Sequence, residues 1–95
     1  MEPNRAHVDA DAYAARINRC LGAELRRRRE ALGLSAYALG KAGRVTDQTI
    51  LNIEQDRVEP LLATLARLCV PFETTLTELV RAAEAADREP PNAFG

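Results

Sequence analysis

The sequence predicts an all-α protein built from five helices. Apolar residues recur at helical spacing over most of the 95 residues, no stretch alternates apolar and polar residues for long, and aromatic residues make up only 4% of the chain. A chain of this length forms one domain. We expect a flexible N-terminus at residues 1–8, one helical domain at residues 9–86, and a disordered tail at residues 87–95, which holds too little apolar surface to order itself.

The first helix is predicted to run from about Asp9, its N-cap, to Leu32, and Gly33 is expected to end it. Gly22 lies in its middle and is expected to kink the helix or to divide it in two. The apolar positions that recur about once per turn are Tyr13, Ile17, Leu21, Leu25 and Leu32.

Ser35 is a good N-cap for a second helix that runs to about Lys41, and residues 42–45 form a turn. Thr46 is the N-cap of a third helix, which ends near Glu54. The apolar positions of these two helices and their turn are Ala38, Leu39, Ala42, Val45, Ile50 and Ile53.

Pro60 suits the first turn of a fourth helix, because its missing N–H has no intrahelical partner there, and Pro71 is expected to interrupt that helix. The predicted buried stripe of the fourth helix consists of Leu61, Leu62, Leu65 and Leu68. Thr75 and Glu78 form a capping box that opens a fifth helix, which ends at about Ala86. One face of the fifth helix carries Leu76, Leu79, Val80 and Ala83.

The sequence offers little material for catalysis or metal binding. It has one histidine, His7, and two cysteines, Cys20 and Cys69, which fit core packing as small apolar residues. No nucleophile, general base or set of metal ligands is grouped, so we expect no enzyme, no metal site and no cofactor. No apolar run approaches the roughly 20 residues of a membrane span, and the N-terminus lacks the apolar centre of a signal peptide. We therefore expect a cytoplasmic protein without a membrane partner.

The net charge of −1 is unevenly distributed along the chain. Residues 21–68 carry seven arginines and Lys41 against six acidic residues, a charge of +2, whereas residues 69–95 carry two arginines against five acidic residues, a charge of −3. A strongly basic face is the usual sign of a nucleic-acid binder. By itself, this distribution is a weak indication of DNA binding.

The second and third helices, with a turn of three to four residues between them, have the lengths of a helix-turn-helix unit, whose second helix lies in the DNA major groove. A helical hairpin without a nucleic-acid role has the same lengths. Residues 25–79 resemble the Cro/C1-type (XRE-like) helix-turn-helix family without a gap. The matching residues are Leu25, Arg29, Gly33, Leu34, Ser35, Leu39, Val45, Thr46, Thr49, Ile50, Ile53, Glu54, Arg57, Pro60, Leu65, Leu76 and Leu79. The resemblance implies a five-helix, lambda-repressor-like domain that binds a two-fold-symmetric double-stranded DNA operator as a dimer.

In a helix-turn-helix protein, the exposed start of the third helix reaches the base edges. Here the candidate base-reading residues are Thr46, Asp47, Gln48, Leu51 and Asn52. Gln48 and Asn52 lie four residues apart on one face, and their amides can pair with adenine. The simpler alternative is two solvated polar side chains. Asp47 can accept a hydrogen bond from cytosine, or it can stabilise the helix N-terminus, the role that we favour.

The candidate phosphate contacts are Ser35, Lys41, Arg44 and Arg57. The resemblance favours Arg57, because the loop after the third helix approaches the DNA backbone in this family; the alternative is a solvated loop arginine. The resemblance also implies a structural ion pair between Arg29 and Glu54 that ties the first helix to the third.

The chain departs from the family pattern at three places. Ala36 replaces a glutamine that contacts a phosphate in relatives. Asp56 stands where relatives have a small glycine or asparagine, and Gly43-Arg44 stands where they have leucine followed by glycine.

Two apolar surfaces are expected to be available to a second copy of the chain. They lie on the N-terminal extension of the first helix and on the fifth helix, and the candidate contacts are Tyr13, Ile17, Leu76, Leu79, Val80 and Ala83. The alternative is that both surfaces pack within one monomer.

Together these features predict a sequence-specific, dimeric transcription regulator, a repressor that reads the major groove with residues 46–54. The rival prediction is a helix-turn-helix-fold protein-interaction module, an antitoxin or adaptor with weak or no DNA binding. Ala36, Asp47 and the acidic C-terminal segment favour that rival, which would need a protein partner.

Overall fold

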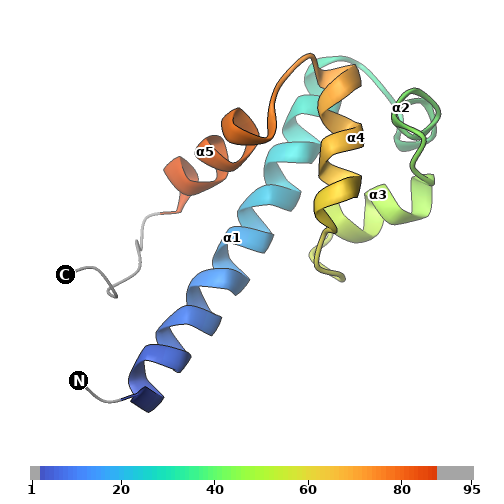
Figure 1. Ribbon diagram of the computed structural model, residues 1–95. Helices are drawn as coiled ribbons and strands as arrows, with labels where there is room; N and C mark the ends of the chain where they lie inside the picture. Colours follow the sequence, from blue (N-terminus) through green and yellow to red (C-terminus); the bar gives the residue numbers. More distant parts are fainter. Residues whose placement is uncertain (1–2, 88–95) are drawn as a thin grey trace.

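The computed structural model describes residues 3–87, and within this range all regular structure is helical (Figure 1). The five helices are α1 (Pro3–Ala31), α2 (Ala36–Gly43), α3 (Asp47–Glu54), α4 (Leu62–Phe72) and α5 (Leu76–Ala86). The predicted all-α, five-helix class is confirmed. The predicted flexibility of residues 1–2 and 88–95 concerns segments outside the described residues.

Helix α1 is one continuous helix of 29 residues, about 43 Å long. It begins at Pro3, so the prediction that Asp9 is its N-cap is wrong. It ends at Ala31, and Gly33 follows in the left-handed conformation with φ 68°, as expected for the glycine that ends a helix. The N-terminal part of α1 projects beyond the other helices (Figure 1).

Gly22 neither divides nor kinks α1 in the way we expected. A Cβ atom at this position would collide with the backbone carbonyl of Ile53 near the end of α3. The glycine is needed because α1 and α3 cross in close contact, which is a use of glycine that helical periodicity alone does not reveal.

The core lies where all five helices meet. Its most deeply buried large side chains, each less than 2% exposed, are Leu25, Leu39, Ile50, Ile53, Leu68 and Leu79. Cys69 is buried among them, and burial raises the pKa of its thiol. Cys20 is half-buried and packs against the same core, so both cysteines lie where core packing predicted them.

Helix α4 differs from the prediction at both of its ends. It begins at Leu62, so Pro60 precedes the helix instead of lying in its first turn, and Leu61 and Leu62 are 72% and 68% exposed. The predicted burial of these two leucines is wrong, because the side of α4 that packs on the core is the one that carries Thr64, Leu65, Leu68 and Cys69. Pro71 does not interrupt α4 but lies in its last turn, where the missing N–H removes a single helical hydrogen bond.

Helix α5 packs along α1, and this contact uses most of the surface that we assigned to a second copy. Leu79 and Ala83 are completely buried in the monomer, so the prediction that they contact a partner is wrong. Ile17, Leu76 and Val80 are partly buried against the same core.

Polar contacts complete the packing of α5 on α1. Tyr13 donates a hydrogen bond to Glu84 at 2.9 Å, and Arg16 forms an ion pair with Asp87 at 3.0 Å. The N-terminal extension of α1 is therefore held by α5 of its own chain.

The predicted cap of α5 is present in part. The Thr75 hydroxyl accepts a hydrogen bond from the Glu78 backbone N–H at 3.2 Å. The Glu78 carboxylate accepts from the Thr74 hydroxyl at 2.9 Å, so the reciprocal half of the capping box is replaced by a neighbouring side chain.

Candidate nucleic-acid interface

The turn between α2 and α3 is short and fixed by backbone geometry. Helix α2 ends at Gly43, two residues later than predicted, so the turn consists of residues 44–46. Arg44 adopts the left-handed conformation, and the Val45 N–H donates to the Gly40 carbonyl at 2.9 Å. A side chain at Gly40 would collide with the carbonyl of Val45, so this turn requires glycine there.

Two of the departures from the family pattern fall at left-handed positions. Arg44 has φ 59° and Asp56 has φ 57°. Glycine and asparagine adopt this conformation with little strain, which explains why the family pattern has them at these places. This chain keeps two charged residues there against the backbone preference.

Both predicted N-caps of the helix-turn-helix unit are present. Ser35 Oγ accepts from the Ala38 N–H at 3.0 Å, and Thr46 Oγ1 accepts from the Thr49 N–H at 3.1 Å. The Thr46 hydroxyl also donates to Thr49 Oγ1 at 2.8 Å. A phosphate contact from the Thr46 hydroxyl would compete with its hydrogen bond to Thr49, whereas the Ser35 hydroxyl accepts in its cap and can still donate its proton.

The two candidate amides lie together on the surface of α3. Gln48 is exposed and Asn52 is half-buried, and Gln48 Nε2 donates to Asn52 Oδ1 at 3.0 Å. Leu51, one residue before Asn52, is half-buried. Ile50 and Ile53 anchor the opposite side of α3 in the core, so the amide pair sits on a rigidly held helix.

Asp47 is exposed in the first turn of α3, and its carboxylate accepts a hydrogen bond from the Gln48 backbone N–H at 2.9 Å. This contact satisfies one N–H that has no intrahelical partner, and it places a negative charge at the positive end of the helix. The geometry therefore suits the helix-terminal role that we favoured for Asp47.

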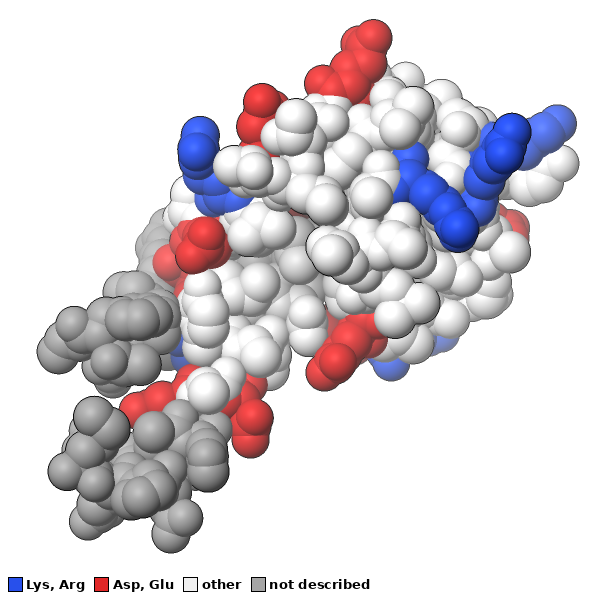
Figure 2. Space-filling model, in the orientation of Figure 1, with Lys and Arg blue, Asp and Glu red and all other residues white. Residues whose placement is uncertain are grey.

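Exposed basic side chains surround α3. Lys41 and Arg44 lie on α2 and its turn, where they line a shallow hollow beside the start of α3. Arg57 is exposed in the loop after α3, and its N–H donates to the Asn52 carbonyl at 2.9 Å. In Figure 2 basic side chains project from the end of the molecule that holds α2.

Sequence reasoning missed one residue of this surface, Tyr37. It is 63% exposed and lines the same hollow, and the Lys41 ammonium lies 5.9 Å from its ring centroid. The signal was available in the sequence, since an aromatic residue four positions before a lysine shares its helix face.

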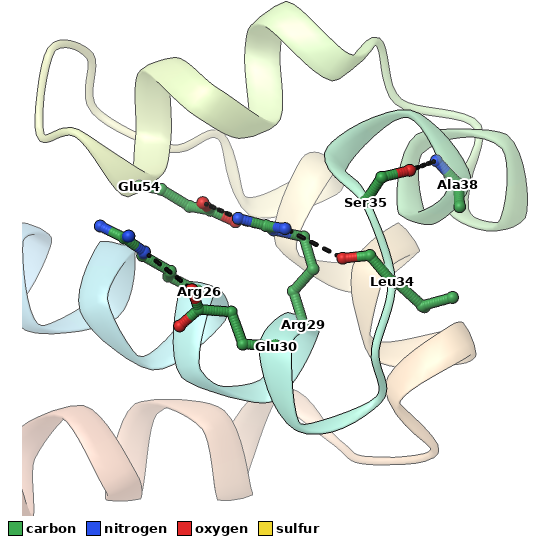
Figure 3. A network of polar contacts seen from close by, with 7 residues as sticks. All are labelled: Arg26, Arg29, Glu30, Leu34, Ser35, Ala38 and Glu54. Atoms are coloured by element: carbon green, nitrogen blue, oxygen red, sulfur yellow. Dashed lines mark hydrogen bonds and ion pairs between the residues drawn. The ribbon is translucent and has the colours of Figure 1, made fainter.

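The structure brings Arg29 and Glu54 together at a nearly buried site (Figure 3). Arg29 donates two hydrogen bonds to the Glu54 carboxylate, at 2.7 and 2.9 Å, and one to the Leu34 carbonyl at 2.9 Å. The hydrogen bond that Arg29 donates to Glu54 raises the pKa of Arg29 above its usual value. The guanidinium thus joins α1, the segment before α2 and the end of α3, and it fixes the orientation of α3.

Helix α1 carries four consecutive arginines, residues 26–29. The three other than Arg29 pair with acidic residues of the same helix. Arg27 and Arg28 both bond to Glu24, and Arg26 pairs with Glu30 at 3.4 Å. The hydrogen bond from Arg27 is the main cause that lowers the pKa of Glu24. This run is largely neutralised on α1, away from the face of α3.

Comparison with known proteins places this geometry in a family. A family model described as a helix-turn-helix domain matches residues 21–88. The chain belongs to this helix-turn-helix family. The resemblance to XRE-like proteins is thereby confirmed, and the α1 residues before 21 lie outside the match. The family and the fold are those of DNA-binding regulators, which are in general not enzymes.

Two solved structures have the same fold. Both are crystal structures of the clp gene regulator ClgR from Corynebacterium glutamicum, with 26% sequence identity to this chain and TM-scores of 0.68 and 0.67. Each match covers 74% of this chain, and the matches cover 74% and 90% of the ClgR chains. No curated protein sequence matches the chain.

Among residues 3–87 no three or more His, Cys, Asp or Glu side chains are arranged to hold a metal ion. None of the helices in that part of the chain has the length and apolar content required to cross a bilayer.

Proposed function

We propose that the protein is a sequence-specific transcription regulator that binds double-stranded DNA as a dimer and represses by occupying a promoter in the bacterial cytoplasm. The observation that carries the proposal is the surface pair Gln48 and Asn52 on α3, held in place by the core and by Arg29. The fold shared with the regulator ClgR supports it.

The amide pair has a chemical preference. Once Gln48 Nε2 bonds to Asn52 Oδ1, the Gln48 Oε1 acceptor and the Asn52 Nδ2 donor remain to face a base. Adenine presents the complementary set in the major groove, the N7 acceptor and the N6 donor. We infer that the operator half-site contains an A·T pair opposite this part of α3.

We infer that Lys41, Arg44 and Arg57 contact phosphates, an inference supported by their exposed positions before and after α3. Arg44 is the most informative of the three, because the chain keeps a long cation where the backbone favours glycine. A residue held at an unfavourable backbone conformation is a reason to look for a function there. Phosphate binding by Arg44 supplies that function.

The first test selects DNA fragments from the source genome by binding to the protein and maps the protected site. Gln48→Ala should weaken binding to that site by roughly 1–3 kcal/mol and relax the preference at one A·T pair. Gln55→Ala is the matched control, because Gln55 is an exposed glutamine at the opposite end of α3. An unchanged site preference in Gln48→Ala would remove this residue from the reading face.

The second test uses the two left-handed charged residues. Arg44→Gly and Asp56→Gly should each raise the free energy of unfolding, by up to about 1 kcal/mol, because each relieves left-handed strain. Arg44→Gly alone should weaken DNA binding and reduce the dependence of affinity on salt by about one phosphate contact. Equal DNA affinity in the two variants would exclude Arg44 as a phosphate ligand.

A second candidate function, a protein-interaction module such as an antitoxin or adaptor, is favoured by the exposed apolar side chains of α4. The two functions differ in their response to salt. A DNA-binding regulator loses affinity steeply as salt rises, because phosphate contacts release counterions. An interaction module protects no DNA site at any salt concentration.

A further inference from the structure

The outer side of α4 carries a row of uncovered apolar residues. Leu62, Ala66 and Val70 lie four residues apart along the helix, and Leu61 precedes them; we call these four residues the α4 stripe. Leu61, Leu62 and Val70 are 72%, 68% and 73% exposed, the three most exposed large apolar side chains of the described residues. Neighbouring exposed apolar side chains form a candidate interaction surface, whereas single exposed apolar residues need no such explanation.

The low charge of α4 also favours an interaction surface. Its eleven residues contain one charged side chain, Arg67. The surface over α4 is mainly uncharged in Figure 2, whereas acidic side chains lie beyond its two ends. Centres of protein interfaces are depleted of charged residues, and their rims are polar. The α4 stripe has this arrangement within one helix.

The order of the residues indicates which partner fits. Reading from either end, the stripe presents a large side chain, a small alanine and a large side chain. When two such helices pack antiparallel about a two-fold axis at Ala66, Leu62 of one copy meets Val70 of the other, and the two alanines allow the helix axes to approach closely. Rows of residues four apart are also the ridges by which helices most often pack in globular proteins.

We propose that the α4 stripe is the surface through which two copies of this chain associate, by an isologous contact centred on Ala66. The inference rests on the proposed function in one respect, namely that a two-fold operator calls for a dimer. None of the candidate DNA contacts belongs to the stripe, so pairing through α4 leaves both copies of α3 free. The two reading helices must then lie about 34 Å apart, one turn of DNA.

The apolar area of the stripe lies below that of a specific interface at the lower size limit, so a weak, reversible dimer is expected. A large aliphatic side chain offers roughly 100 Å² of apolar surface, so three of them about 70% exposed on two copies bury roughly 400 Å². A specific interface at the lower size limit, about 1,000 Å², contains roughly 570 Å² of apolar surface. Ala63, Ala66 and the aliphatic part of Arg67, all exposed on α4, supply further area.

The test measures self-association of the full chain by analytical ultracentrifugation over a range of concentrations without DNA. Leu62→Glu and Val70→Glu should each weaken the dimer about tenfold or more, because each places a charge in the apolar contact between Leu62 of one copy and Val70 of the other. Leu32→Glu is the matched control, since Leu32 is 53% exposed at the end of α1, and it should leave the dimer unchanged. Circular dichroism shows whether each variant is folded, which is expected for exposed positions.

A second measurement locates the two-fold axis. In a Cys20→Ala background, where the buried Cys69 is the remaining native thiol, Ala66→Cys should form a disulfide between copies under mild oxidation. Ala85→Cys, exposed on α5, should form none. Efficient cross-linking at Ala85 with none at Ala66 would overturn the proposal, and so would a wild-type chain that stays monomeric at high concentration or a dimer unaffected by Leu62→Glu.

DNA binding is scored separately, so that the two proposals fail independently. Monomeric Leu62→Glu should still bind a single half-site with the salt dependence of the wild type, and it should lose cooperativity on the full operator. A chain that pairs through Ala66 but protects no DNA at any salt would support the α4 contact and overturn the proposed regulator. If Leu62→Glu leaves the wild-type dimer intact and the operator footprint is unchanged, the proposed regulator is supported and the α4 contact is overturned.

Discussion

Helices α4 and α5 have the same length, eleven residues, and each has an apolar face, yet they differ in which of the predicted apolar residues they bury. We expected Leu61 and Leu62 of α4 to be buried and Leu79 of α5 to face a second copy. The structure reverses these roles: Leu61 and Leu62 are exposed, whereas Leu79 is completely buried. Helical spacing therefore identifies an apolar face but does not say which neighbour covers it.

The neighbour in question is α1. Because α1 continues well beyond the residues that match the family, α5 has a long apolar partner within its own chain. Leu61 and Leu62, at the start of α4, have no such partner. Viewed down the helix axis, Leu62 lies at the edge of the buried side, between the buried Cys69 and the exposed Ala66, and it continues the exposed row of Ala66 and Val70.

The largest expected effect compares the two helices by truncation. Leu79→Ala should lower the free energy of unfolding by about 2–5 kcal/mol, because it leaves a cavity in the core. Leu62→Ala should change it by less than about 0.5 kcal/mol, as is usual for exposed positions. Denaturant titration at a concentration where the chain is monomeric measures both. A similar loss of stability in the two variants would show that Leu62 is packed within the monomer as Leu79 is.

A smaller effect is expected from the helix caps. Thr75 caps α5 with its side chain, whereas Leu61, in the extended conformation suited to an N-cap, makes no such hydrogen bond for α4. Thr75→Ala should destabilise the monomer by about 1 kcal/mol, and Leu61→Ser should stabilise it by about 0.5–1 kcal/mol. Thermal unfolding measures both changes, and loss of stability in Leu61→Ser would show that this leucine packs within the monomer.

The smallest effect concerns pH. The hydrogen bond to Glu84 raises the pKa of Tyr13 above 10, its ordinary value, so the folded state binds the phenolic proton more tightly than the unfolded state. This contribution to stability is complete below pH 10 and is lost as the pH rises through the raised pKa. Tyr13→Phe should remove this part of the alkaline pH dependence, whereas Leu62→Ala should leave it intact. If the free energy of unfolding of wild type and Tyr13→Phe depends on pH in the same way above pH 10, the contribution assigned to Tyr13 is wrong.

Much of the fold and of the site is local, and for that reason the sequence predicted it. Ser35, Thr46 and Thr75 cap helices three residues ahead, and Gly33 ends α1, all within one turn of chain. The contact between Arg29 and Glu54 spans 25 residues, and we expected it only through the family resemblance. The amide pair on α3 also follows from its spacing of four residues.

What could not be predicted depends on how helices meet. The need for glycine at position 22 arises from the carbonyl of Ile53, which lies 31 positions away in the sequence. The packing of Leu79 depends on where α5 settles along α1. The family prefers glycine or asparagine at positions 44 and 56 because the backbone there is left-handed. The sequence shows that Arg44 and Asp56 depart from this pattern, but it does not show the backbone angles that explain the pattern.

The close crossing of α1 and α3 at Gly22 affects how the DNA-binding surface that we propose on α3 can change in evolution. Because the end of α3 rests on the bare backbone of α1, a methyl group added at position 22 would displace α3, the helix that we propose reads DNA, from the side opposite its exposed face. Base preference could thus change through a residue that never meets a nucleotide. Selection for an altered operator should recover substitutions at this crossing as well as on the outward face of α3.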